Sequence, residues 1–241
     1  MGGMTQPKQQ PVAIVTGASR GFGSAVTAAL LDRGWTVVGD ARRVSELEST
    51  VRNWNSLNFI ALPGDVTDAS HRAELVAAAR NAGPLGLLVN NASQLGPSPQ
   101  PALADYPASE LWAVYQTNLF APLALIQATL PALVDNAGVI VNLTSDAAVE
   151  PYPGWGGYGS SKAALDQLSA VLAAEAPAVA VYAFDPGDMR TEMHQAAFPG
   201  EDISDRAEPA SVVPAFLRLL DTRPASGRYR AADLTLSGAR R

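Results

Sequence analysis

The feature that most constrains the fold is a regular alternation of short strand-like runs with longer segments rich in alanine and leucine. Most of the runs lack an alternation of polar and apolar residues, which is typical of strands covered on both faces. Such an alternation predicts βαβ units and therefore an α/β fold with one doubly wound sheet of six to seven parallel strands flanked by helices. The predicted strands are Val12–Thr16, Thr36–Gly39, Asn58–Leu62, Leu87–Asn90, Gly138–Leu143, Val179–Phe184 and Arg228–Leu234.

The segments between these runs are long enough for helices. They are Gly21–Arg33, Val44–Asn53, Ala69–Asn81, Ala108–Val134, Gly157–Glu175 and Pro209–Leu220. Six or seven strands with their helices account for residues 12–241, so we expect a single domain there. Residues 1–11 are polar and lack the apolar stretch of a secretory signal, and we expect them to form a flexible leader.

The composition narrows the chemistry that the chain can carry out. It has no cysteine and only two histidines, His71 and His194. This excludes thiolate nucleophiles and cysteine-bound metals, and it disfavours a serine–histidine triad, so we expect no metal site. The net charge of −6 disfavours nucleic acid as a partner.

The longest apolar stretch, Leu119–Val134, contains two prolines and is shorter than the roughly 20 residues of a spanning helix. We therefore expect a buried core helix, no membrane partner and a cytoplasmic location.

A glycine-rich segment follows the first predicted strand. Thr16–Gly23 reads TGASRGFG, with the spacing G-x-x-x-G-x-G rather than G-x-G-x-x-G. Glycines allow the backbone to approach a pyrophosphate, and the N–H groups at the start of a helix face the anion. The segment predicts a Rossmann-like phosphate cradle, although a tight turn without a ligand or a methyltransferase loop could have a similar sequence.

The end of the second predicted strand holds the residues that distinguish NAD from NADP. Asp40 would bind ribose hydroxyls and favour NAD, whereas Arg42 would bind the 2′-phosphate of NADP. We expect Asp40 to lie one residue too early, still on the strand. Arg42 would then hold the phosphate together with Arg20 or Arg43, which favours NADP over NAD.

Tyr158 and Lys162 can together supply acid/base chemistry. They are four residues apart near the start of a predicted helix and so share one of its faces. A phenol with a pKa near 10 is a poor acid or base at pH 7, and a nearby ammonium is expected to lower that pKa. Ser145, at the end of the fifth strand, can hydrogen-bond a substrate oxygen. Taken alone, such a tyrosine–lysine pair also fits an ordinary surface pair.

In combination, these motifs resemble the short-chain dehydrogenase/reductase family. The glycine loop is similar to its T-G-x-x-x-G-x-G segment, and Asn90–Ser93 resembles its N-N-A-G segment. The pair Asp65-Val66 is similar to the pair that contacts adenine, and Pro186-Gly187 with Thr191 resembles the P-G-x-x-x-T segment that holds the nicotinamide carboxamide. The order and spacing of four further residues resemble the family's catalytic tetrad: Asn118, Ser145, Tyr158 and Lys162.

The resemblance implies an oxidoreductase that moves hydride between NADP(H) and a carbonyl or a secondary alcohol. Tyr158 would be the general acid/base, and Lys162 would bind the nicotinamide ribose and lower the tyrosine pKa. Ser145 would polarise the substrate oxygen, and Asn118 would hold a water in a proton relay. The residues expected to bind the cofactor are Gly17, Ser19, Arg20, Gly21, Phe22, Gly23, Arg42, Asp65, Val66, Asn91, Ala92, Tyr158, Lys162, Pro186, Gly187, Met189 and Thr191.

Two long loops, Ser93–Pro107 and Asp185–Glu208, follow strands and are expected to line a substrate cleft. The expected substrate is a partly apolar carbonyl or alcohol, because the pocket candidates mix aromatic, aliphatic and acidic groups. These candidates are Ser93, Leu95, Asp146, Tyr152, Trp155 and Met193.

Ser93 stands where the family has glycine. We expect some strain there if the backbone needs a positive φ, and a narrower floor of the nicotinamide pocket. His194 is expected to be a surface residue of the second loop, and His71 to lie on the helix after Val66 without a role.

The helix Gly157–Glu175 is apolar almost all round, and relatives usually assemble through this helix and the one before it. We therefore expect a homodimer or homotetramer. The alternative to catalysis is a non-catalytic NAD(P)-binding sensor or scaffold on the same fold, which would be expected to have a broken tetrad.

Overall fold

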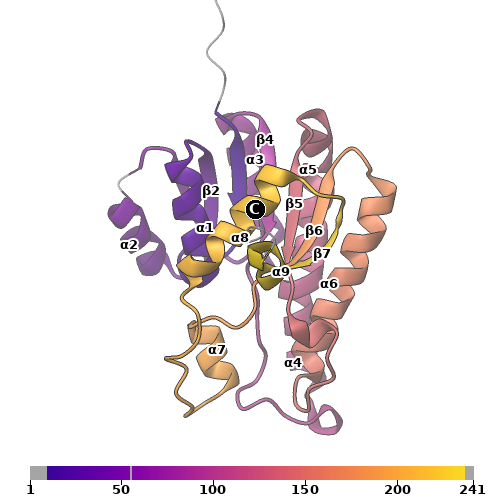
Figure 1. Ribbon diagram of the computed structural model, residues 1–241. Helices are drawn as coiled ribbons and strands as arrows, with labels where there is room; N and C mark the ends of the chain where they lie inside the picture. Colours follow the sequence, from indigo (N-terminus) through magenta and orange to yellow (C-terminus); the bar gives the residue numbers. More distant parts are fainter. Residues whose placement is uncertain (1–9, 55, 237–241) are drawn as a thin grey trace, which may run out of the picture.

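The computed structural model describes residues 10–54 and 56–236, and its centre is a parallel sheet with the strand order β3-β2-β1-β4-β5-β6-β7 (Figure 1). This confirms the predicted doubly wound α/β fold, with all seven strands in one sheet. The strands are β1 (Val12–Val15), β2 (Thr36–Ala41), β3 (Phe59–Pro63), β4 (Leu85–Asn90), β5 (Val139–Leu143), β6 (Ala180–Asp185) and β7 (Gly227–Arg230). Nine residues of the predicted leader, 1–9, lie outside the described part of the chain.

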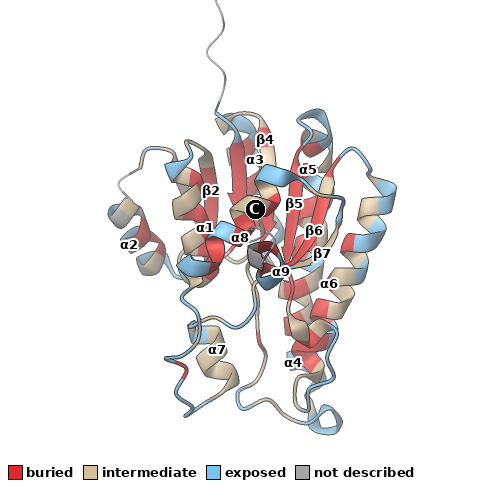
Figure 2. Ribbon diagram, in the orientation of Figure 1, coloured by how far each residue is buried: buried red, intermediate tan, exposed pale blue. Residues whose placement is uncertain are grey.

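Helices connect the strands and cover both faces of the sheet. They are α1 (Gly21–Asp32), α2 (Val44–Trp54), α3 (Ala69–Ala82), α4 (Ala108–Tyr115), α5 (Ala121–Asp135), α6 (Gly156–Glu175), α7 (Glu192–Ala197), α8 (Pro209–Thr222) and α9 (Ala231–Leu236). Figure 2 shows that the strands are largely buried, whereas the helices expose their outer sides. The continuous apolar runs predicted from the sequence therefore belong to strands covered on both sides.

Each face of the sheet has its own apolar core. On one face, α1 and α8 pack against β6 through three phenylalanine rings, Phe22, Phe184 and Phe216, whose centroids lie 5.9 Å apart in each pair. On the other face, α3, α5 and α6 bury aliphatic side chains such as Leu75 and Leu125 against the strands. Edge-to-face and offset ring pairs add roughly 0.5–1.5 kcal/mol each beyond their buried area.

The end of the chain differs from the sequence-based prediction. The strand predicted over Arg228–Leu234 ends at Arg230, and the chain then forms α9. Ala231 and Leu234 face the core that contains α8, because a helix places residues three apart on one side. Apolar spacing in so short a segment does not distinguish a strand from a helical turn.

The predicted helix Ala108–Val134 is present as one helical stretch in which α4 and α5 are joined by a π-helical turn, Gln116–Phe120. The stretch Ala108–Asp135 is long and apolar enough to cross a membrane by composition alone, with a mean hydropathy of 1.4. In the fold, however, residues such as Leu125 and Ile126 pack into the core against the sheet. This placement agrees with the expected core helix.

The loops that follow β4 and β6 leave the sheet at the carboxyl ends of the strands, as Figure 1 shows at its lower end. The second of them is not a plain loop, because it contains α7, whose first turn is capped by Thr191. The Thr191 hydroxyl accepts a hydrogen bond from the His194 N–H over 3.2 Å. Ligands of open α/β sheets bind at this end.

Candidate active site

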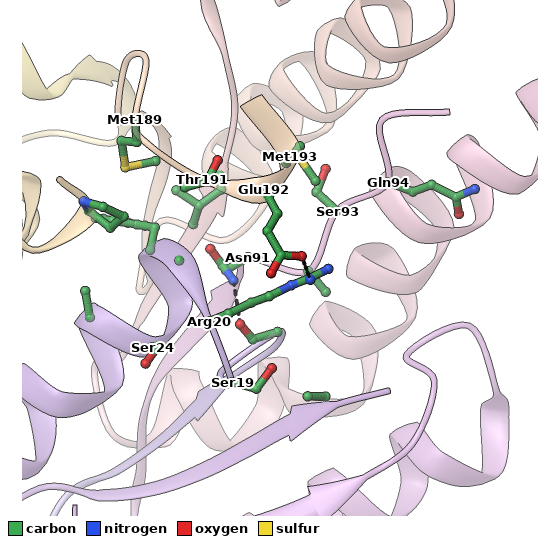
Figure 3. A pocket seen from close by; sticks show the side chains of 18 of the residues that line it. Ser19, Arg20, Ser24, Asn91, Ser93, Gln94, Met189, Thr191, Glu192 and Met193 are labelled. Carbon is green, nitrogen blue, oxygen red and sulfur yellow. Dashed lines mark hydrogen bonds and ion pairs between the residues drawn. The ribbon is translucent and has the colours of Figure 1, made fainter. Parts of the chain in front are cut away.

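A cavity of about 850 Å³ opens at the carboxyl ends of β1, β2, β4, β5 and β6. Its walls come from the glycine loop after β1, from the loop after β4 and from the segment that contains α7 (Figure 3). A cavity of this size lies within the usual range for small-molecule and cofactor sites. The structure therefore brings both long loops to one cleft, as the sequence predicted.

The glycine loop is held in a conformation that its glycines make possible. Gly17 has a φ of +68°, a value that side chains disfavour. At Gly23, a Cβ atom would lie 2.2 Å from the Gly17 carbonyl oxygen, so only glycine fits. Asn91 closes the loop from β4, because its Nδ2 donates to the Thr16 carbonyl over 2.8 Å.

Asp40 lies on β2, as expected, and both oxygens of its carboxylate contact other groups of the protein. One carboxylate oxygen accepts a hydrogen bond from the Gly17 N–H over 2.7 Å, and the other lies 3.1 Å from His71 Nε2. Both side chains are buried. The hydrogen bond from His71 to Asp40 raises the pKa of the imidazole above its usual value, and burial opposes this rise. His71 is on α3, as predicted, where it supports the glycine loop through Asp40.

The cavity is also lined by three arginines, Arg20, Arg42 and Arg43. They give it local positive charge although the protein as a whole is acidic. Two carboxylates lie among these cations, and sequence reasoning missed the first of them, Glu46. Glu46 pairs with Arg43, and the hydrogen bond from this guanidinium holds the pKa of Glu46 below its usual value. Glu192, from the first turn of α7, pairs with Arg20 across the cleft (Figure 3).

Tyr158 and Lys162 lie near the start of α6, and both contribute to the cavity wall. The Lys162 Nζ atom lies 5.5 Å from the centre of the Tyr158 ring and donates to the Leu143 carbonyl over 2.7 Å. Burial lowers the pKa of Lys162 to about 8. The predicted pairing of tyrosine and lysine on one helix face is thus present.

The expected lowering of the tyrosine pKa is not found in the ligand-free protein. Burial raises the pKa of Tyr158 above its usual value, and the nearby hydroxyls of Ser93 and Ser145 oppose this rise. Asp185 and Asp146 raise it further. Burial is the largest of these effects, because a phenolate without solvent or cofactor around it lacks stabilisation.

Ser145 lies two residues after the end of β5, and its hydroxyl donates to Asp146 Oδ1 over 3.0 Å. The Ser145 carbonyl accepts a hydrogen bond of 2.9 Å from Arg228 on β7. The same guanidinium also pairs with Asp166 on α6 and with Asp185 at the end of β6. Sequence reasoning missed Arg228, because β7 is the farthest strand along the chain from the glycine loop.

Asn118 lies in the π-helical turn between α4 and α5 and is fully buried. Its side-chain oxygen accepts from the Gln94 N–H over 2.8 Å and from the Ser93 hydroxyl over 3.1 Å. Its Nδ2 donates to the Gln94 carbonyl and to the Ser161 hydroxyl, each over 2.9 Å. Turns of this π-helical type are frequent at functional sites.

Most of the residues predicted to bind the cofactor line the cavity. Gly23 and Gly187 do not, because Gly23 packs beneath the glycine loop and Gly187 turns the chain after β6 with a φ of +74°. Ser145 and Asn118 are not among the residues that line the cavity. The predicted residues on the cavity wall are Gly17, Ser19, Arg20, Gly21, Phe22, Arg42, Asp65, Val66, Asn91, Ala92, Tyr158, Lys162, Pro186, Met189 and Thr191.

The candidate substrate residues divide into two groups. Ser93, Leu95 and Met193 line the cavity, whereas Asp146, Tyr152 and Trp155 lie outside its lining. Asp146 accepts a hydrogen bond from the Tyr152 hydroxyl over 3.0 Å, and the Trp155 ring packs edge-on against Tyr158 at 5.8 Å. Of the second group, Trp155 contacts Tyr158 and packs in the same apolar cluster as Leu95 and Met193.

The structure corrects the expectation for His194 and settles the condition that was set for Ser93. The His194 side chain is only 9% exposed, because its ring packs on Phe198 at 4.9 Å. It is therefore not the surface residue that the sequence predicted. Within the described part of the chain, the Ser93 backbone does not have a positive φ. The serine therefore causes no strain of that kind.

Comparison with known proteins agrees with this geometry. The profile of the short chain dehydrogenase family matches residues 11–202. The chain belongs to the short chain dehydrogenase family. It is therefore an oxidoreductase of the family that acts on an alcohol or a carbonyl with NAD(P).

Several known members of the family are similar to this chain in sequence or in structure. Sepiapterin reductase of Meriones unguiculatus is 37% identical over 201 residues, which cover 77% of each chain. Serine 3-dehydrogenase of Agrobacterium fabrum is 35% identical over 185 residues, which cover 74% of this chain and 72% of that protein. A short chain dehydrogenase of Shigella flexneri complexed with NADP superimposes with a TM-score of 0.85 at 28% identity, over 93% of this chain and 100% of that one.

Proposed function

We propose that this short chain dehydrogenase moves hydride between NADP(H) and a carbonyl or secondary alcohol, with Tyr158 as the general acid/base. The observation that carries the proposal is that Tyr158 and Lys162 occupy one wall of the cavity, whose other end is surrounded by Arg20, Arg42 and Arg43. The tyrosine–lysine wall supports proton transfer beside the substrate. The arginine end supports binding of a phosphorylated nucleotide.

The preference for NADP over NAD rests on Asp40 and Arg42. Both carboxylate oxygens of Asp40 are engaged by Gly17 and His71, which leaves this carboxylate poorly placed to select a ribose hydroxyl. Arg42 is exposed at the cavity wall and forms no ion pair within the described chain. A guanidinium there can hold a 2′-phosphate through charge-assisted hydrogen bonds.

The residues present fit the proposed cofactor. Thr16–Gly23 forms the loop on which a pyrophosphate would rest, and Asp65 and Val66 line the cavity where adenine would bind. Pro186 and Thr191 line the part in which we place the nicotinamide carboxamide, and Lys162 would bind the ribose. When bound, the cofactor supplies or accepts the hydride.

The protein's own residues handle the substrate oxygen and its proton. In the reductive direction, Ser145 would orient the carbonyl oxygen and Tyr158 would donate a proton to it. The Lys162 ammonium would then stabilise the resulting phenolate across the helix face. Asn118 would hold the loop after β4 in place and take part in a water-mediated relay of protons to Tyr158.

The substrate is proposed to be a partly apolar small molecule. Leu95 from the loop after β4 and Met193 from α7 present apolar groups to the cavity near Tyr158. A hydroxyl or carbonyl held against Tyr158 would have an apolar remainder against these side chains. We infer a cytoplasmic location for this activity.

We further infer assembly as a homodimer or homotetramer. The α4–α5 stretch exposes the Trp112 and Phe120 side chains, which pack on each other at 5.7 Å, and α6 exposes Val171. Sedimentation at micromolar concentration should show particles larger than 25.1 kDa. Only monomers at that concentration would contradict the assembly.

The test of the function is a panel of aldehydes, ketones and secondary alcohols with NADPH, NADH, NADP⁺ and NAD⁺. We expect turnover of some members, with NADP(H) preferred, and loss of turnover in Tyr158→Phe with nucleotide binding retained. Binding of nucleotide without turnover of any member would instead favour a non-catalytic sensor or scaffold. Retained turnover in the Tyr158→Phe variant would contradict the assigned mechanism.

A further inference from the structure

Glu46 contributes a carboxylate to the same cavity that the three arginines line. It lies on α2 and is one of the lining residues, together with Arg20, Arg42 and Arg43. Its side chain is 29% exposed. A carboxylate repels a phosphate and an arginine attracts one, so this part of the cavity wall combines opposite effects on a phosphorylated ligand.

The Glu46 carboxylate contacts three groups that are expected to face the cofactor. One oxygen, Oε1, pairs with Arg43 and lies 4.0 Å from Arg20 Nη1. The other, Oε2, accepts a hydrogen bond of 3.4 Å from the Ser19 hydroxyl. The hydrogen bond from Arg43 holds the pKa of Glu46 below its usual value, so the carboxylate is ionised at neutral pH.

The helix that carries Glu46 is fixed to the glycine loop. The hydroxyl of Thr50, one turn further along α2, lies 2.9 Å from the Glu46 carbonyl oxygen and 3.1 Å from the Ser19 carbonyl oxygen. Leu47 is buried in the same apolar core as Phe22 of α1. The carboxylate can turn about its side-chain bonds, but the helix keeps it beside the glycine loop.

The three arginines differ in their partners. Arg20 pairs with Glu192 from α7, in addition to its proximity to Glu46 (Figure 3). Arg43 pairs with Glu46, whereas Arg42 forms no ion pair among the residues that the structure describes. A phosphate held by Arg42 would therefore reach Arg20 and Arg43 in competition with carboxylates. Glu46 is the carboxylate that lies within ion-pair distance of both.

We propose that Glu46 is a specificity-determining residue that competes with the 2′-phosphate of NADP for Arg20 and Arg43. The carboxylate neutralises these two cations in the free protein and repels the phosphate when NADP binds. The protein then prefers NADP less strongly than its arginines alone would dictate, and it retains the ability to use NAD. The proposal rests on the proposed binding of NADP(H) with Arg42 at the 2′-phosphate.

The competition acts on the 2′-phosphate and leaves the rest of the nucleotide unaffected. A phosphate monoester carries close to two negative charges at about pH 7.5, whereas the ribose hydroxyl that replaces it in NAD carries none. Removal of the Glu46 charge should therefore tighten the binding of 2′,5′-ADP. It should leave the binding of 5′-AMP, which has the 2′-hydroxyl, nearly unchanged.

The test measures the Kd of 2′,5′-ADP and of 5′-AMP for the full chain and for Glu46→Gln, by displacement titration at about 20 mM and about 500 mM NaCl. At low salt we expect Glu46→Gln to bind 2′,5′-ADP about 5- to 20-fold more tightly, because one nearby like charge is lost. At high salt the gain should fall to about twofold, because ions screen the repulsion at a partly exposed site. The Kd of 5′-AMP should change by less than about twofold.

Two further variants separate the charge from other effects of the substitution. Glu46→Ala should tighten the binding of 2′,5′-ADP as much as Glu46→Gln does, which would show that no new amide contact is responsible. Glu48→Gln is the matched control, because it removes a negative charge from the same helix at an exposed residue that lies near Arg52. It should leave both constants within about twofold of the unchanged protein.

Unchanged or weaker binding of 2′,5′-ADP by both Glu46 variants would overturn the proposal. So would an equal gain in Glu48→Gln, or an equal gain for 5′-AMP, since neither fits a local repulsion of the 2′-phosphate. The titrations need no turnover, so tighter binding without turnover of any substrate would contradict the proposed function and support the role of Glu46. Turnover with NADP(H) but no tightening would do the reverse, and no binding of 2′,5′-ADP by any variant would overturn both.

Discussion

Arg228 Nη2 donates to Asp185 Oδ2 over 2.9 Å and thereby joins β7 to the end of β6, directly before Pro186-Gly187. Asp185 is buried, and the same guanidinium nitrogen reaches the Ser145 carbonyl over 2.9 Å. One side chain from the last strand thus fixes the segments that carry Ser145 and the proposed nicotinamide contact. The third partner, Asp166, lies one turn after Lys162 on α6.

Arg228→Met should therefore weaken both stability and turnover. The substitution would leave two largely buried carboxylates without their cation, and we expect the free energy of unfolding to fall by about 2–4 kcal/mol. Urea unfolding measures this loss. Arg230→Met is the matched control on the same strand, because Arg230 is exposed, and it should change the free energy of unfolding by less than about 0.5 kcal/mol. Equal losses in the two variants would contradict the role of Arg228.

Arg42→Ala should weaken binding of ligands that carry a 2′-phosphate. We expect the Kd of 2′,5′-ADP to rise about 10–100-fold, since charge-assisted hydrogen bonds are lost, while the Kd of 5′-AMP changes little. Displacement titrations with the two nucleotides measure both constants. Arg52→Ala, which removes an exposed arginine from the same region of the chain, should leave both unchanged. A similar rise for both nucleotides would refute a specific contact with the phosphate.

Lys162 should make stability rise with pH above neutrality. Burial lowers its pKa to about 8 from a usual value of 10.5, so between these values the unfolded chain binds more protons than the folded one. The difference in free energy of unfolding, unchanged protein minus Lys162→Met, should therefore increase by about 2 kcal/mol from pH 8 to pH 9.5. Urea unfolding across this range measures the difference. A constant difference would mean that Lys162 does not titrate there in the folded protein.

The His71–Asp40 pair should have the opposite dependence on pH. The hydrogen bond with Asp40 raises the pKa of His71 in the folded protein above 6.5, and Glu74 and Asp68 add to this rise. The stability that protonated His71 contributes is complete below pH 6.5 and is lost as the pH rises through the folded-state pKa. The free energy of unfolding, unchanged protein minus His71→Gln, should therefore decrease from pH 6 to pH 8.5. An increase over that range would contradict a charged pair.

The fold was predictable because its signals are local. Buried parallel strands appear as apolar runs, and the alternation with helices leaves one arrangement of sheet and layers. The glycine loop was equally predictable, because the motif places glycine at two positions where a side chain is disfavoured. Gly17 has a positive φ, and Gly23 packs too closely against the loop for a Cβ atom. The secondary structure near the end of the chain was not predictable. The four residues of β7 run directly into α9, and a short apolar pattern fits either a strand or a helix.

The sequence by itself determined the doubly wound sheet and the residue types available for chemistry, with Tyr158 and Lys162 on one helix face. Only the tertiary structure decided what surrounds them. Burial raises the pKa of Tyr158, where helix spacing alone predicted a lower value. It also brings Ser93, from a loop 65 residues earlier, to the same cavity as Tyr158 and into a hydrogen bond with Asn118. Spacing along a helix is a local property, whereas solvation and contacts between distant segments exist only once the chain has folded.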